Sequence, residues 1–196
     1  MNYIFDIGKV FLDFEPLEFL RRRYDEETAQ AVYGMMFGPV WDRLDAGDLL
    51  PENAPDAFCP VDHPLRPAVD DTYARWEDIL VPMEDTIRFA QRLRGQGRRL
   101  FYLTNFQKGF EDIARRKGIF HLFSGGVVSS TERLMKPDPR IYRLLLNRYG
   151  LTAADCVFFD DRQENVDAAC ALGIKGIVFT DAAQAEKELH ELTRRD

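Results

Sequence analysis

Residues 4–14 read IFDIGKVFLDF, a short apolar run that ends at Asp6, with a glycine at position 8. Apolar runs of this length, rich in aromatic and β-branched residues, are typical of buried strands. The pattern predicts a strand over residues 2–6 with a carboxylate at its carboxyl end. The question is what Asp6 does there, and whether it works without a second acid at position 8.

Four later segments share the short apolar character of the first strand, and helical patterns that end in glycine separate them. The predicted strands are 99–103, 127–130, 157–160 and 174–180, and the predicted helices are 83–97, 110–118, 139–150 and 163–173. Alternation of this kind predicts a parallel sheet with helices on both faces, an α/β Rossmann-like three-layer core. We expect a last amphipathic helix to pack on the sheet through Ala185, Leu189 and Leu192.

Residues 15–81 break the alternation. They contain several helical patterns and no convincing strand, and their middle part, residues 49–68, is rich in proline, which resists helix interiors. We therefore expect residues 15–81 to form a small helical domain inserted after the first strand. The core domain is then made of residues 1–14 and 82–196.

Composition narrows the function classes. A net charge of −7, with 45% hydrophobic and 30% charged residues, is typical of a globular protein and argues against nucleic-acid or anionic-membrane binding. No apolar run approaches the roughly 20 residues of a membrane span, and the N-terminus lacks the shape of a signal peptide. Three widely spaced cysteines favour free thiols in a reducing cytoplasm. The sequence does not indicate an oligomeric state.

Polar residues gather at the predicted strand ends, where open parallel sheets bind ligands. They are Asp6, the pair Thr104 and Asn105, the pair Asp160 and Asp161, and Lys136 in the loop after the third strand. Carboxylates suit Mg²⁺, and lysine with a hydroxyl suits a phosphoryl group. A free carboxylate in such a crevice can be a nucleophile that becomes an aspartyl phosphate.

In order and spacing, these signals resemble the haloacid dehalogenase-like (HAD) hydrolase superfamily. DIG, YLTN, LMKPDPRIY and FFDDRQENV are similar to its four motifs, and residues 15–81 stand where such proteins carry a helical cap of the first type. The resemblance implies a Mg²⁺-dependent phosphatase acting on a small phosphorylated metabolite. It implies Asp6 as nucleophile and metal ligand, the Gly8 carbonyl as metal ligand, Thr104 and Asn105 as phosphoryl-binding residues, Lys136 as the neutralising charge, and Asp161 with Asp160 beside it as further metal ligands.

Gly8 departs from the usual pattern, in which a second aspartate protonates the leaving oxygen. The form DxGxV resembles a branch related to glucose-1-phosphate phosphatase, which implies a sugar phosphate, although Lys9 stands where that branch usually has Asn. General acid catalysis is worth about 10²–10⁴ in rate. We therefore expect a preference for good leaving groups, or a proton from water or from a cap residue, with Asp42 and Lys9 as candidates.

Other interpretations stay open. Gly8 also fits a weak or inert HAD-fold protein that binds a phosphorylated ligand or a partner, and a phosphotransferase or mutase is a further possibility. A metal-free dehalogenase is disfavoured, because Asp160 and Asp161 beside Asp6 would repel without a cation. Asp160 and Asp161 could also cap the next helix, and Asn165 could orient Asp161 or face the loop.

Overall fold

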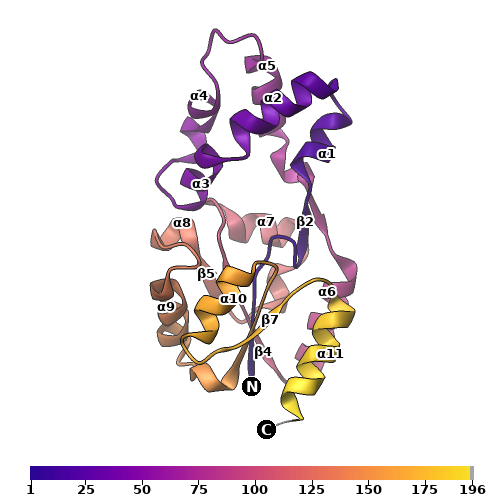
Figure 1. Cartoon of the computed structure of the whole chain (residues 1–196), viewed down its shortest axis with the longest axis vertical. Coiled ribbons are helices and arrows are strands. Elements are labelled where there is room, and N and C mark those ends of the chain that lie inside the picture. Colours follow the sequence, from indigo (N-terminus) through magenta and orange to yellow (C-terminus); the bar gives the residue numbers. More distant parts are fainter. Residues whose placement is uncertain (195–196) are drawn as a thin grey trace.

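The computed structural model describes residues 1–194, apart from the side chain of Thr193. Its centre is a five-stranded parallel sheet in the order β5-β4-β1-β6-β7 (Figure 1). β1 lies in the middle, and Ile4 is opposite Phe101 of β4 and Phe158 of β6. The predicted α/β fold with a parallel sheet is confirmed. The strands are β1 (Asn2–Phe5), β4 (Arg99–Thr104), β5 (Gly126–Val128), β6 (Cys156–Asp160) and β7 (Lys175–Val178).

Both faces of the sheet are buried, which is why its strands read as nearly continuous apolar runs. Along β1, Tyr3 and Phe5 enter one apolar cluster and Ile4 enters the other. The first cluster is completed by α6 (Glu84–Gly95), α7 (Phe110–Arg116) and α11 (Ala182–Thr193). The second is completed by α9 (Pro139–Tyr149) and α10 (Gln163–Cys170). As expected, Ala185 and Leu189 of α11 are buried, and Leu192 packs against the same cluster.

Two local predictions were wrong. The predicted strand 127–130 ends early, because Ser129 begins the short helix α8 (Ser129–Glu132) and its hydroxyl bonds to loop backbone instead. A strand also occurs at the end of 15–81: β3 (Leu80–Pro82) crosses the expected boundary and pairs antiparallel with β2 (Leu12–Phe14). Three residues that include a proline are too few for a recognisable alternation.

Residues 15–81, called the cap below, lie as one group of helices above the carboxyl edge of the sheet, joined to it by the β2–β3 ribbon (Figure 1). The cap has an apolar cluster of its own that includes Leu20, Val32 and Phe58. The proline-rich part, residues 49–68, which the notion of proline as a helix breaker would leave as loops and short turns, contains α4 and the first residues of α5. The cap helices are α1 (Pro16–Arg21), α2 (Glu26–Met36), α3 (Pro39–Asp45), α4 (Ala54–Phe58) and α5 (Arg66–Ala74).

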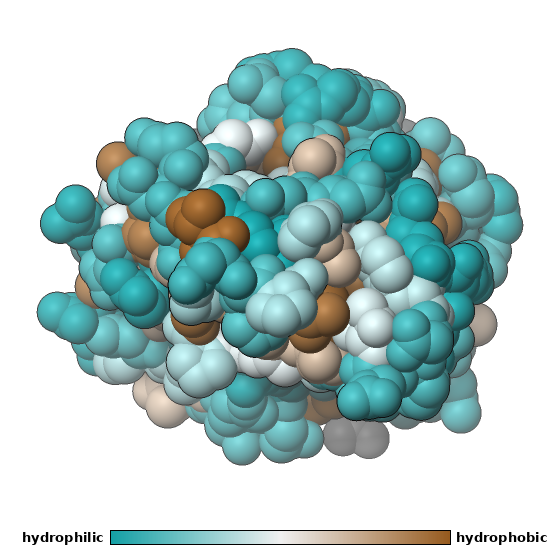
Figure 2. Space-filling view, turned by 90° about the horizontal axis from the view of Figure 1, so that it is seen from above, coloured by the Kyte–Doolittle hydropathy of each residue, from teal (hydrophilic) through white to brown (hydrophobic). Residues whose placement is uncertain are grey.

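Single 3-10 turns complete the described part of the chain, at Pro51–Asn53, Trp76–Ile79, Phe120–Leu122 and Ala153–Asp155. Seen from above, the outer surface of the cap is mainly hydrophilic, with a few separate apolar residues (Figure 2). Within residues 1–194, no helix has the length and apolar character needed to cross a membrane. The exact division into 1–14 with 82–196 and 15–81 stays a prediction.

Candidate active site

Asp6 follows β1 at the carboxyl edge of the sheet. Its backbone N–H donates to Phe159 O at 2.8 Å, and its Oδ1 accepts from Ile7 N at 2.7 Å. The same oxygen lies 2.8 Å from Lys136 Nζ. Burial is the main cause that raises the pKa of Asp6, to about 7. The charge of Lys136 lowers this pKa, and the charge of Asp160 raises it by a smaller amount. The hydrogen bond from Ile7 N and the ion pair with Lys136 therefore fix the position of the Asp6 carboxyl group.

Lys136 is the central cation of the site. Its side chain is 1% exposed, and its Nζ lies 2.8 Å from Asp6 and 2.6 Å from Asp160. Asn105 holds the Lys136 backbone at both polar atoms, because Nδ2 donates to Lys136 O at 3.0 Å and Oδ1 accepts from Lys136 N at 2.8 Å. Asn105 thus positions Lys136, a contact that its predicted phosphoryl-binding role did not include.

Asp160 and Asp161 end β6 and differ in their surroundings. Asp160 is fully buried, and besides Lys136 it accepts from Arg162 N and from Asn165 Nδ2, each at 2.9 Å. Asn165 therefore orients Asp160, which neither of the two expectations, orienting Asp161 or facing the loop, had included. Asp161 is only partly buried and lines a cavity. Burial and the charge of Asp160 raise its pKa.

The three carboxylates fit a divalent cation. Asp6, Asp160 and Asp161 each offer one oxygen, and these oxygens lie within 4.8 Å of one another. Lys136 supplies one positive charge to this group, at Asp6 and Asp160, so the three carboxylates keep a net negative charge that a divalent cation would neutralise. Carboxylate oxygens are the ligands that Mg²⁺ prefers, and it commonly retains several waters. Because Asp160 already accepts three hydrogen bonds, Asp6 and Asp161 are the freer ligands.

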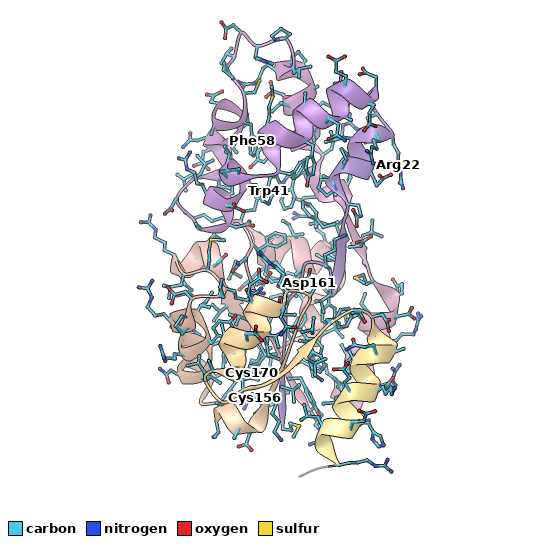
Figure 3. All side chains as sticks on the ribbon, viewed as in Figure 1. Arg22, Trp41, Phe58, Cys156, Asp161 and Cys170 are labelled. Atoms are coloured by element: carbon cyan, nitrogen blue, oxygen red, sulfur yellow. The ribbon has the colours of Figure 1, made fainter. Side chains whose placement is uncertain are left out.

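A cavity of about 200 Å³ opens above these residues, between the cap and the core. Its floor is polar, with Asp6, Gly8, Asn105, Lys136 and Asp161 among the lining residues. Figure 3 shows Trp41 of the cap above Asp161 of the core. The apolar residues of the lining are Phe14, Trp41, Trp76, Leu80 and Phe106.

The predicted site residues therefore fall into two groups. Asp6, Gly8, Asn105, Lys136 and Asp161 line the cavity, whereas Thr104, at the end of β4, and Asp160 are buried outside its lining.

The two predicted proton sources have different surroundings. Asp42 is exposed and does not line the cavity. Lys9 lines it, but its Nζ is paired with Asp13 at 3.1 Å and with Glu15.

Two cavity residues had escaped the sequence analysis. Asp45 is the last residue of α3, and burial, Asp42 and Asp6 raise its pKa to about 8. Gln107 is 2% exposed, and its Nε2 has no hydrogen-bond partner among the described residues. Asp45 belongs to no motif, because it reaches the site only when the cap docks. Gln107 follows Asn105 by two residues, which is the one signal that could have found it.

Residues 8–173 match the family model of the haloacid dehalogenase-like hydrolases. The chain belongs to this hydrolase family. The HAD-like chain is 26% identical, over 96% of its length and 94% of the relative's, to the sesquiterpene phosphatase astK of Aspergillus oryzae. It superposes on a predicted HAD-like hydrolase of Porphyromonas gingivalis with a TM-score of 0.74 at 20% identity, covering 98% and 97% of the two chains.

A second solved structure is a HAD-family enzyme of Bacteroides thetaiotaomicron in complex with magnesium and inorganic phosphate. Its TM-score is 0.72 at 17% identity, covering 91% of this chain and 93% of that one. At this identity the likeness concerns the fold. The predicted superfamily and fold are confirmed by these comparisons.

Proposed function

We propose that this HAD-like hydrolase is a Mg²⁺-dependent phosphatase that hydrolyses a small phosphorylated metabolite through a phosphorylated Asp6. The observation that carries the proposal is the pairing of Asp6 with Lys136 at 2.8 Å, below a cavity that Asp161 also lines. The similarity to a sesquiterpene phosphatase over nearly the whole chain agrees with phosphate-ester chemistry. Three cysteines that are all free agree with a cytoplasmic location.

Each residue has a defined task in this reaction. Asp6 attacks phosphorus in line, forms the acyl phosphate and releases the alcohol, and water then hydrolyses the acyl phosphate. Lys136 holds Asp6 in one orientation and neutralises charge on the phosphoryl oxygens. Asn105 lines the cavity and holds the Lys136 backbone beside the phosphoryl group, whereas Thr104 is buried outside the lining. When bound by Asp6, Asp161 and the Gly8 carbonyl, with Asp160 behind them, Mg²⁺ supplies further charge neutralisation.

The cavity limits the organic part of the substrate. A cavity of about 150 Å³ holds one benzene molecule, so about 200 Å³ suits a phosphate with a small group attached. The aromatic wall of Phe14, Trp41, Trp76 and Phe106 favours a group that presents an apolar face, either a compact hydrocarbon or the less polar face of a sugar ring. The cap, which supplies Trp41 and Trp76, selects the leaving group.

Phosphate release by the purified protein, with and without Mg²⁺, tests the proposal. The panel contains an aryl phosphate, an acyl phosphate, glucose 1-phosphate, glucose 6-phosphate and a short isoprenyl phosphate, with Asp6→Asn as the blank. Metal-dependent release that the blank lacks supports the phosphatase. Binding of phosphate esters without phosphate release above the blank would instead favour an inert HAD-fold protein. Transfer of the phosphoryl group to the hydroxyl group of a second compound would favour a phosphotransferase.

A further inference from the structure

The core side of the cavity lacks a proton donor where one is expected. Gly8 lines the cavity, and a Cβ built on it would have no neighbour within 4 Å. Its φ is not positive, so neither packing nor backbone strain requires glycine there. The position is open space, and a leaving oxygen beside it would find no carboxylic acid from this loop, whose Lys9 is paired with Asp13 and Glu15. An alkoxide leaving group needs a proton from another part of the molecule.

Asp45 approaches the same cavity from the cap. A segment of the core holds its backbone there: Ser129 Oγ donates a hydrogen bond to the Asp45 carbonyl. Gly47, at φ 76°, allows this approach, because a Cβ at that residue would collide with the Ser130 carbonyl. The backbone at Asp45 is therefore fixed against the core, and the residue lines the cavity.

The charges around Asp45 come from both sides of the cavity. Asp42 on its own helix and Asp6 on the core both disfavour its ionised form, and the Gln107 N–H favours it. The cations that line the same cavity are Lys9, Lys136 and Arg162, and Asp161 is the remaining acid. Burial is the largest effect and raises the pKa of Asp45 to about 8, so the neutral carboxylic acid predominates near pH 7. A partly buried acid kept neutral in this way is suited to proton donation.

We propose that Asp45 donates the proton to the leaving oxygen, in place of the aspartate that Gly8 replaces. The inference rests on the phosphatase function proposed above. As Asp6 bonds to phosphorus and the ester P–O bond breaks, the bond's electron pair goes to the leaving oxygen, which takes the Asp45 proton. Asp45 is left as a carboxylate. It then accepts a proton from the water that attacks the acyl phosphate, which restores the acid and regenerates Asp6.

Leaving-group dependence tests this role directly. In Asp45→Asn, kcat/KM for an alkyl phosphate should fall by about 10²–10⁴, because its leaving group needs the proton. For an aryl phosphate such as p-nitrophenyl phosphate, whose leaving group is stable as an anion, the fall should be less than about tenfold. kcat/KM reports the transfer of phosphorus to Asp6, so slow hydrolysis of the intermediate does not mask the effect. The matched control is Asp48→Asn, an exposed aspartate three residues further along the chain and outside the cavity lining, which should leave both values unchanged.

A rescue variant separates chemistry from folding. Position 8 has room for a side chain. Adding Gly8→Asp to Asp45→Asn should therefore raise kcat/KM for the alkyl phosphate at least about tenfold above that of Asp45→Asn alone. Partial unfolding of the sample lowers the apparent kcat/KM for both substrates by the same factor and leaves the ratio of the two values unchanged. An unchanged alkyl-to-aryl ratio in Asp45→Asn, with an active wild type, would overturn the inference and leave the phosphatase proposal standing. A wild type that releases no phosphate from any substrate would overturn both.

Discussion

Replacing Lys136 with methionine should destabilise the fold severely, because Lys136 is the cation between two buried carboxylates. Its Nζ lies 2.8 Å from Asp6 and 2.6 Å from Asp160, and its side chain is 1% exposed. Methionine fills a similar volume but leaves both acids without their partner. Removing one member of a buried ion pair costs about 3–5 kcal/mol, because an uncompensated charge remains in the interior. For a chain of this length, that corresponds to a fall in melting temperature of roughly 6–20 °C.

The pH dependence of this loss identifies its cause. Burial already raises the pKa of Asp6, and Lys136 is the group that opposes the rise, so the pKa of Asp6 rises further in Lys136→Met. As pH falls, Asp6 in the variant takes up a proton and no longer carries a buried charge. The difference in unfolding free energy between wild type and variant is therefore largest near pH 8 and smaller near pH 5.5.

Urea unfolding of metal-free protein at these two pH values measures the effect. The matched control is Lys9→Met, because Lys9 also pairs with two carboxylates, Asp13 and Glu15, but is 37% exposed. An exposed pair is worth about 0–1 kcal/mol. Adding Asp160→Asn to Lys136→Met should recover part of the loss, since it removes one orphaned charge. A loss no larger than that of Lys9→Met, or one that grows as pH falls, would refute the reasoning.

Three further changes have defined outcomes. Asp161→Asn should raise the Mg²⁺ concentration for half-maximal phosphate release by about tenfold or more, since even partners of metal ligands contribute 10–100-fold to affinity; an unchanged Mg²⁺ titration would remove Asp161 from the ligands. Gly47→Ala should lower the melting temperature more than Gly97→Ala, because both glycines have φ 76° but only at Gly47 does a Cβ collide with the Ser130 carbonyl; equal shifts would contradict the tight docking of α3. In metal-free protein, the unfolding free energy of Asp45→Asn should rise relative to that of wild type between about pH 5 and pH 8, by at most ~1.4 kcal/mol per pH unit. The reason is that the raised pKa of Asp45 makes the native wild type bind a proton that its unfolded state has released. A difference independent of pH would show that the pKa of Asp45 is not raised.

The sequence predicted the parts of the site that depend on local pattern. Asp6 and Asp160 each end an apolar run, and parallel strands bring their carboxyl ends to one edge of the sheet. The closeness of these two aspartates could therefore be predicted without knowing the loop conformations. The contact of Asn105 with the Lys136 backbone did not follow, because it joins two loops 31 residues apart whose conformations leave no periodic signal.

The cap shows the same limit. Asp42 and Asp45 are both acidic residues of one short helix, and the sequence does not show which of them faces the core. That choice depends on how the helix docks, through Gly47 and the Ser129 hydroxyl, and neither contact has a signature in the sequence. The ribbon strand β3 was missed because its pairing with β2 comes from the crossing of two chain segments at the base of the cap.

Trapping the covalent intermediate tests the central claim most directly. The protein would be mixed with Mg²⁺ and a ³²P-labelled acyl phosphate, quenched in acid within one turnover, and digested for peptide mapping. The account predicts label on the peptide that contains Asp6, sensitive to hydroxylamine as an acyl phosphate is, and absent in Asp6→Asn. Release of phosphate by Asp6→Asn at the wild-type rate, or wild-type turnover with no label on this peptide, would contradict it.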